Sequence, residues 1–183
     1  MTHVAKEGNR RKGDMTRAER DQSVLDVASW WRKNAGNILE ESRGADDRDK
    51  QMLEKVIDAN IPEELLSIMS IQDGQLWFSE KQALTCRAMV AAALEFEQRS
   101  RGWRHGLIPF AKDANGNFLV ADTNARGCPV EEWNAEGEVS AVSKTFSLFL
   151  ECYRNDLLSG RCEYVDGIGI IEKVDNASTR RGK

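Results

Sequence analysis

The sequence predicts an α+β fold, in which a mainly antiparallel sheet is flanked by helices and preceded by an N-terminal helical region. Residues 1–100 of the 183-residue chain carry helix-start signals and a helical spacing of apolar residues. After Gly102, short apolar runs are separated by turn residues, as in β-hairpins. Strands and helices do not alternate regularly, so an antiparallel sheet is favoured over a parallel one.

Two capping-box patterns predict helix starts in the first half of the chain. Thr16 and Glu19 form the first, and the apolar stripe behind them predicts a helix over residues 16–43. The second is Ser-Glu-Lys-Gln at residues 79–82, which predicts an Ala-rich helix that runs to Arg99. Between the two, acidic residues and then a proline predict two further helix starts, at residues 46–49 and at residues 60–64.

The second half of the chain is predicted to form hairpins. Its Asn-Gly and Asp-Gly pairs, at residues 115–116 and 166–167, supply the positive φ angles of tight turns. A helix capped by Ser143 or Thr145 separates the two groups of strands and stops at Gly160. The expected strands are residues 76–78, 107–111, 117–122, 130–133, 138–142, 162–165 and 168–171.

One face of the helix after Thr145 is apolar and is expected to pack on the sheet. The helical spacing places Phe146, Phe149, Leu150 and Tyr153 on this face. The expected sheet partners are Ile108, Phe118, Val120 and Val130. If this packing is right, Phe149→Ala costs about 3–5 kcal/mol of stability.

The net charge of −4 is unevenly distributed along the chain. Residues 1–20 hold six Lys/Arg against three acids and residues 173–183 hold four against one, so each segment carries +3 and residues 21–172 carry −10. We expect disordered basic tails at residues 1–15 and 173–183 around a single domain at residues 16–172. An acidic body argues against a nucleic-acid platform and suits a protein partner with a basic surface.

Composition narrows the class of protein further. The sequence has no apolar run long enough to span a bilayer and no apolar leader at its N-terminus, which predicts a cytoplasmic protein. The four cysteines form no Cys-x-x-Cys pair, and His3 and His105 are the only histidines. We therefore expect free thiols and no metal or other cofactor.

The search for catalytic residues finds little. His105 is a candidate general base, but the sequence indicates no nucleophile or orienting acid beside it. Gly-Ile-Gly at residues 167–169 lacks the third glycine of a dinucleotide loop. The run at residues 113–117 lacks the glycine and glutamate positions of a calcium loop. The sequence therefore predicts a protein that is not an enzyme.

Aromatic residues next to acids form the candidate binding surface. Trp77 follows a turn, while Glu131, Glu132 and Glu136 surround Trp133. Tryptophans near turns are common anchors at protein interfaces, and acids beside them favour a basic partner. The alternative for both tryptophans is a place in the core. On the interface interpretation, Trp133→Ala weakens binding by about 2 kcal/mol and leaves the fold intact.

Five segments of the chain form an ordered set of motifs. The segments are IPEELLSI with the turn QDG (61–68 and 72–74), WRHGLIPFA (103–111), DANGNFLVAD (113–122), GCPVEEW (127–133) and TFSLFL (145–150). In this order they resemble the SUKH superfamily, which groups fungal cell-wall-synthesis regulators, bacterial toxin-immunity proteins and non-catalytic subunits of eukaryotic complexes. The resemblance covers residues 60–155, about half of the chain.

The resemblance implies an antiparallel sheet flanked by helices and a role in binding proteins, with no catalytic residues to transfer. The leading hypothesis is a non-catalytic protein-interaction module or a subunit of a multiprotein complex. One alternative is an immunity protein that binds and neutralises a nuclease-like toxin, which the acidic body suits. The second alternative is an unrecognised enzyme that uses His105 and carboxylates.

Overall fold

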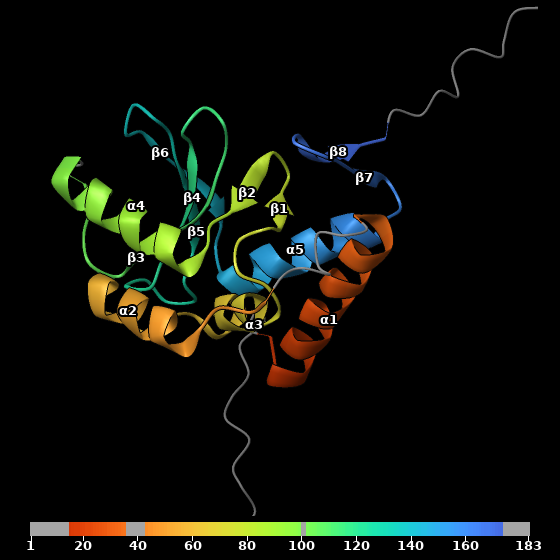
Figure 1. Ribbon diagram of the computed structural model, residues 1–183, viewed down its shortest axis with the longest axis horizontal. Coiled ribbons are helices and arrows are strands. Elements are labelled where there is room, and N and C mark those ends of the chain that lie inside the picture. Colours follow the sequence, from red (N-terminus) through yellow and green to blue (C-terminus); the bar gives the residue numbers. More distant parts are fainter. Residues whose placement is uncertain (1–14, 36–42, 100–101, 174–183) are drawn as a thin grey trace, which may run out of the picture.

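The computed structural model describes residues 15–35, 43–99 and 102–173 and confirms the α+β fold (Figure 1). Nearly all of the two predicted basic tails lies outside the described residues. No helix in the described ranges is both long and apolar enough to cross a membrane. The elements are α1 (Arg17–Asn34), α2 (Asp47–Ile57), α3 (Glu63–Ile71), β1 (Trp77–Phe78), β2 (Lys81–Ala83), α4 (Cys86–Arg99), β3 (Leu107–Lys112), β4 (Phe118–Asp122), β5 (Val130–Trp133), β6 (Val139–Ser143), α5 (Phe146–Leu158), β7 (Cys162–Val165) and β8 (Gly169–Glu172).

Six strands form one antiparallel sheet in the order β1-β2-β3-β4-β5-β6, so each strand pairs with its neighbour in the sequence. The strands β7 and β8 form a separate hairpin, as the Asp-Gly pair predicts. One row of directly opposed residues crosses the whole six-stranded sheet. It consists of Trp77, Gln82, Lys112, Phe118, Trp133 and Val139.

The helices cover the sheet from two sides. Figure 1 shows α1 beside α5 at the right of the molecule, with α2 and α4 at the left. The pair α1–α5 is tied by an ion pair in which Arg154 lies 2.5 Å from Asp26. Phe146 and Leu150 of α5 join the main core, whereas Phe96 of α4 packs into a second, smaller cluster around Trp133.

The alternation of side chains along β4 corrects the predicted packing of α5. Leu119 and Ala121 belong to the main core, so Phe118 and Val120 point to the opposite face and join the second cluster. The prediction that these two residues pack against α5 is therefore wrong. The ring of Phe110 lies against α5 instead, with its centroid 5.2 Å from that of Phe146.

Local signals explain where two helices begin. The Thr16 hydroxyl accepts a hydrogen bond from the Glu19 N–H at 3.1 Å, and the Glu19 carboxylate accepts one from the Thr16 N–H at 2.7 Å, which confirms the capping box. The helix that follows ends at Asn34, well short of residue 43, and residues 36–42 lie outside the described chain. Thr145 caps α5 by accepting a hydrogen bond from the Leu148 N–H at 3.0 Å.

The second capping-box pattern is wrong as a helix start. Ser79 has a φ of 58°, whereas an N-cap residue has an extended backbone, and Lys81 begins strand β2. The helix α4 starts after Thr85, whose hydroxyl accepts a hydrogen bond from the Ala88 N–H at 3.1 Å. Asp73 supports the same helix end by accepting from the Cys86 N–H at 2.7 Å.

The C-terminal hairpin covers the outer side of β1. The Ile170 N–H donates a hydrogen bond to the Ser79 carbonyl at 3.0 Å. Gly169 sits against the same carbonyl with a φ of 110°, and a Cβ atom there would lie 2.3 Å from it. Only glycine permits this close approach.

Candidate functional site

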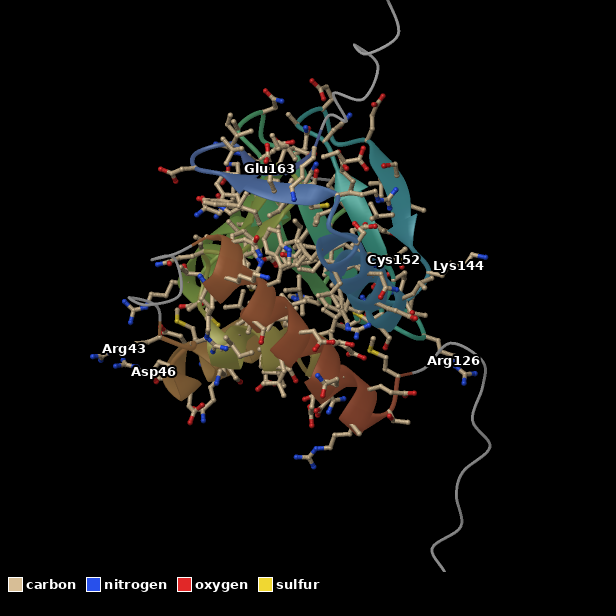
Figure 2. All side chains as sticks on the ribbon, turned by 90° about the vertical axis from the view of Figure 1, so that its right-hand side faces the viewer. Arg43, Asp46, Arg126, Lys144, Cys152 and Glu163 are labelled. Carbon is tan, nitrogen blue, oxygen red and sulfur yellow. The ribbon has the colours of Figure 1, made fainter. Side chains whose placement is uncertain are left out.

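An open groove of about 620 Å³ lies where α5 crosses the sheet. Its buried apolar lining comes from β1, β4 and α5, while Val142 and Leu148 at its rim are 44% and 40% exposed. Figure 2 shows two groove residues, Cys152 and Lys144, on the side of the molecule that faces the viewer. The other residues of the groove are Phe78, Ser79, Glu80, Lys81, Leu119, Glu132, Ser143, Phe149, Tyr153 and Asp156.

Lys81 carries a buried charge in the wall of this groove. Its side chain is only 6% exposed, and its Nζ lies 2.5 Å from Glu80, 3.5 Å from Glu132 and 3.6 Å from Asp113. The buried Asp113 carboxylate also accepts two hydrogen bonds from Asn117, one from its backbone N–H and one from its side-chain amide. The ammonium group therefore ties β2 to β5 and to the turn between β3 and β4.

The charges around Lys81 keep it protonated. Burial lowers the pKa of Lys81, but the hydrogen bond to Glu80 and the negative charges of Glu80, Glu132 and Asp113 outweigh burial and hold this pKa above its ordinary value. Burial raises the pKa of Asp113, yet the hydrogen bonds from Asn117 and the charge of Lys81 leave it below its ordinary value. Because a neutral amine is needed for a base or nucleophile, Lys81 is suited to hold structure rather than to react.

Trp133 lies in the core, which is one of the two alternatives that the sequence left open for it. It is 3% exposed, and its ring centroid lies 5.8 Å from that of Phe96 and 5.5 Å from that of Trp103. Its indole Nε1–H donates a hydrogen bond of 3.1 Å to Glu131. The ring is therefore not available as an exposed anchor in this conformation.

The structure does not bring the five predicted site residues into one patch. Glu131 and Glu132 are adjacent in β5, so Glu131 lies with Trp133 on one face while Glu132 lines the groove on the other. Glu136 is exposed in the turn between β5 and β6. Trp77 is half-buried and belongs to the same row of opposed residues as Trp133. The two lie on β1 and β5, four strand spacings apart, which is roughly 19 Å.

The remaining candidates for chemistry lie apart from the groove or carry no reactive partner. The exposed His105 imidazole is 4.0 Å from the Glu97 carboxylate and outside the groove. Burial raises the pKa of the Cys86 and Cys128 thiols to about 12. Within the part of the chain that the structure describes, no cluster of three or more His, Cys, Asp or Glu residues could hold a metal ion.

Sequence reasoning missed most of the groove. The match of residues 79–82 to a capping box predicts a helix at the wall residue Lys81, which lies in a strand instead. The one available signal was the run Trp77-Phe78 followed two residues later by another short segment, which is the spacing of a tight hairpin. Ser79 at a positive φ is an unusual turn residue, so this signal was weak.

Comparison with known protein families identifies one family whose model matches this chain. The model of the SMI1/KNR4 family (SUKH-1) matches residues 44–152, which is more than half of the chain. The chain belongs to the SMI1/KNR4 family. No curated protein matches it individually.

The SMI1/KNR4 match covers most of the fold and leaves two elements outside the matched residues. The six-stranded sheet, α2, α3, α4 and the first half of α5 lie inside the matched residues. Helix α1 and the β7–β8 hairpin lie outside them. Twelve of the fourteen groove residues lie inside the match, and the remaining two are Tyr153 and Asp156.

Domains of the SUKH superfamily generally act as non-catalytic immunity or regulatory modules, which fits a protein-interaction or immunity-type role.

Proposed function

We propose that this chain is a non-catalytic protein-interaction module that binds a protein partner in the groove between α5 and the sheet. The observation that carries the proposal is the apolar, open groove whose rim residues Val142 and Leu148 stay exposed. Exposed apolar residues that line a concave surface are typical of binding sites. The family membership supports the same class of function.

The charges of the groove favour a partner with a basic segment. Glu80 and Asp156 are exposed and Glu132 is partly exposed, whereas the exposed positive charge is that of Lys144. An apolar side chain with a basic neighbour fits this lining, because the apolar contact supplies affinity and the charges steer the approach. Of the predicted site residues, Glu132 lies in the groove, whereas Glu131, Glu136, Trp77 and Trp133 are not part of its lining.

A variant of Leu148 tests the groove directly. The tagged full chain is expressed in its native cells, and the proteins that co-purify are quantified by mass spectrometry. Leu148→Asp is expected to lose the partner, because a charge in an apolar contact costs desolvation free energy. Leu158→Asp is the matched control, since Leu158 is 50% exposed on the same helix and outside the groove. Equal recovery of all partners with both variants would exclude the groove.

The exposed thiol of Cys152 provides a second readout. A photo-crosslinker attached to Cys152 sits in the groove, whereas Cys86 and Cys162 are buried. We expect the crosslinker to capture the protein that Leu148→Asp fails to retain. Capture of unrelated proteins in both the wild type and Leu148→Asp would count against the proposal.

An immunity function is the second candidate, because residues 21–172 carry a net charge of −10. Such a body suits the blocking of a basic, nuclease-like toxin by charge complementarity. The identity of the crosslinked protein separates the two candidates: a toxin nuclease supports immunity, and a constituent of a cellular complex supports the subunit role.

A further inference from the structure

Among the described residues, nothing pairs with the outer edge of β6. The strand pairs on one side only, with β5, and the residues Val139–Val142 are exposed. Its sequence is Val-Ser-Ala-Val-Ser, with no charged residue and no proline. Native proteins normally protect such an edge with charges, proline or a covering element, so an unprotected edge indicates an interface.

One hydrogen bond shows which backbone groups of β6 point outward. The Asn134 N–H donates to the Glu138 carbonyl at 3.0 Å, so Glu138 turns its polar groups toward β5. These groups alternate along an antiparallel strand, and Ser140 therefore also faces β5. The N–H and C=O groups of Val139 and Ala141 consequently point away from the sheet. A β-bulge at Val142 ends this regular stretch.

The opposite edge of the sheet is not free in this way. There the β7–β8 hairpin lies against β1, and its Ile170 N–H bonds the Ser79 carbonyl. Each copy of the described chain therefore offers one open edge of the six-stranded sheet.

We propose that a second copy of this chain pairs with β6 in an antiparallel arrangement, about a two-fold axis at Ser140. In this register Val139 of each copy opposes Ala141 of the other, so all outward N–H and C=O groups of these residues are satisfied. The two Ser140 residues face each other as a pair that exchanges no backbone bonds. No charged residue opposes a like charge.

The ends of the strand make the pairing complementary in charge. Glu138 precedes β6 and Lys144 follows it, and both are exposed. In the register centred on Ser140, Glu138 opposes Val142 of the other copy, where the bulge ends the regular pairing, and Lys144 follows two residues later, within reach of a long side chain. The two-fold axis repeats this ion pair at the other end.

The helix beside the edge adds apolar contact. The two-fold axis stands perpendicular to the paired strands, so the α5 helices of both copies lie on the same face of one continuous sheet. Val142 of β6 and Leu148 of α5 are exposed, and α5 contacts β6, so both side chains add apolar surface beside the paired edge. The interface is small, so we expect a dissociation constant of about 1–100 µM. The pairing does not rest on the proposed partner function and is measured without a partner.

A disulfide at the axis tests the register. Ser140→Cys in a Cys152→Ser background is expected to form a dimer under mild oxidation, because facing Cβ atoms on adjacent strands fall within the range of a disulfide. Val139→Cys in the same background is the matched control, since Val139 opposes Ala141 and not itself. Equal crosslinking of both variants, or none with Ser140→Cys, would overturn the register.

Sedimentation of the full chain tests the pairing itself. We expect a dimer whose population rises with concentration. Its dissociation constant should increase at least tenfold with Glu138→Lys or with Lys144→Glu, and should return to the wild-type value when both changes are combined. Glu136→Lys makes the same charge change in the adjacent turn and is expected to weaken it less. Ala141→Pro removes an outward N–H that the monomer does not use, so it should abolish the dimer and keep the fold. A wild-type chain that stays monomeric up to about 1 mM would overturn the proposal.

Discussion

The indole Nε1–H of Trp31 donates a hydrogen bond of 2.8 Å to the hydroxyl of Tyr153. That hydroxyl in turn donates to the Trp77 carbonyl at 2.8 Å. A single buried oxygen thus joins α1, α5 and β1, and it links the added helix α1 to the family part of the fold.

Removing this oxygen is expected to destabilise the protein. Tyr153→Phe leaves the Trp31 N–H and the Trp77 carbonyl without their partner in a buried setting, at a cost of about 1–3 kcal/mol in the free energy of unfolding. The measurement is urea denaturation. Tyr164→Phe is the control, because its hydroxyl bonds the exposed Asp166 and its loss should cost much less. Equal midpoints for the two variants would contradict the prediction.

Truncation of Trp133 is expected to act on stability rather than on binding alone. Its ring is buried among Phe96, Trp103 and Phe118, so Trp133→Ala should cost about 3–5 kcal/mol. Thermal unfolding followed by circular dichroism measures it. The sequence-based interpretation expected an intact fold, and a variant that unfolds at the wild-type temperature would restore that interpretation.

Two phenylalanines of α5 should differ in their contribution to stability. Phe146 is 1% exposed and Phe149 is half-buried at the groove, although both contact the ring of Phe110. We expect Phe146→Ala to cost about 3–5 kcal/mol and Phe149→Ala about half as much. Chemical denaturation of both variants gives the comparison, and a larger loss for Phe149→Ala would show that the groove wall is more tightly packed than its exposure indicates.

The ion cluster around Lys81 predicts a pH dependence. The folded pKa of Asp113 lies below its ordinary 3.8, so its contribution to stability is present above that pH and is lost as the pH falls through the folded pKa. The folded pKa of Lys81 lies above 10.5, so its contribution is present below that pH and is lost as the pH rises through the folded pKa.

Replacing the ammonium group should remove most of this dependence. Lys81→Met is expected to cost about 2–3 kcal/mol at pH 7, because Asp113 and Glu132 lose a buried partner. The difference from the wild type should shrink as the pH falls through the folded pKa of Asp113, because the protonated carboxyl no longer needs the ammonium group. Lys50→Met is the control, since its partner Asp47 is 90% exposed and a surface pair contributes little. A difference that stays constant as the pH falls from 7 through the folded pKa of Asp113 would contradict this account.

Much of the fold could be predicted because its signals are local. A capping box at Thr16, a cap at Thr145 and the turns at residues 115–116 and 166–167 each act within a few residues, and all four appear where expected. The pattern at residues 79–82 gave a wrong prediction because its local signal is overridden by contacts with distant residues. Lys81 is held in strand β2 by Asp113 and Glu132.

The candidate site was harder to predict because it depends on which face each residue takes. Glu131 and Glu132 are equivalent as sequence, yet one bonds Trp133 and the other lines the groove. The assignment of faces depends on strand register, and a shift of one residue exchanges them. Burial of Trp133 depends on Phe96 and Trp103, which lie outside its own strand.

The hairpin that lies against β1 limits how far copies of this chain can assemble. A sheet with one open edge accepts one neighbour, so pairing through β6 consumes the available edge and growth stops at two molecules. If residues 162–172 were removed, β1 would become a second open edge, and each added molecule would present a fresh one. Pairing at both edges would extend one sheet from molecule to molecule, as in fibres, so with the proposed pairing at β6 the β7–β8 hairpin limits assembly to two copies.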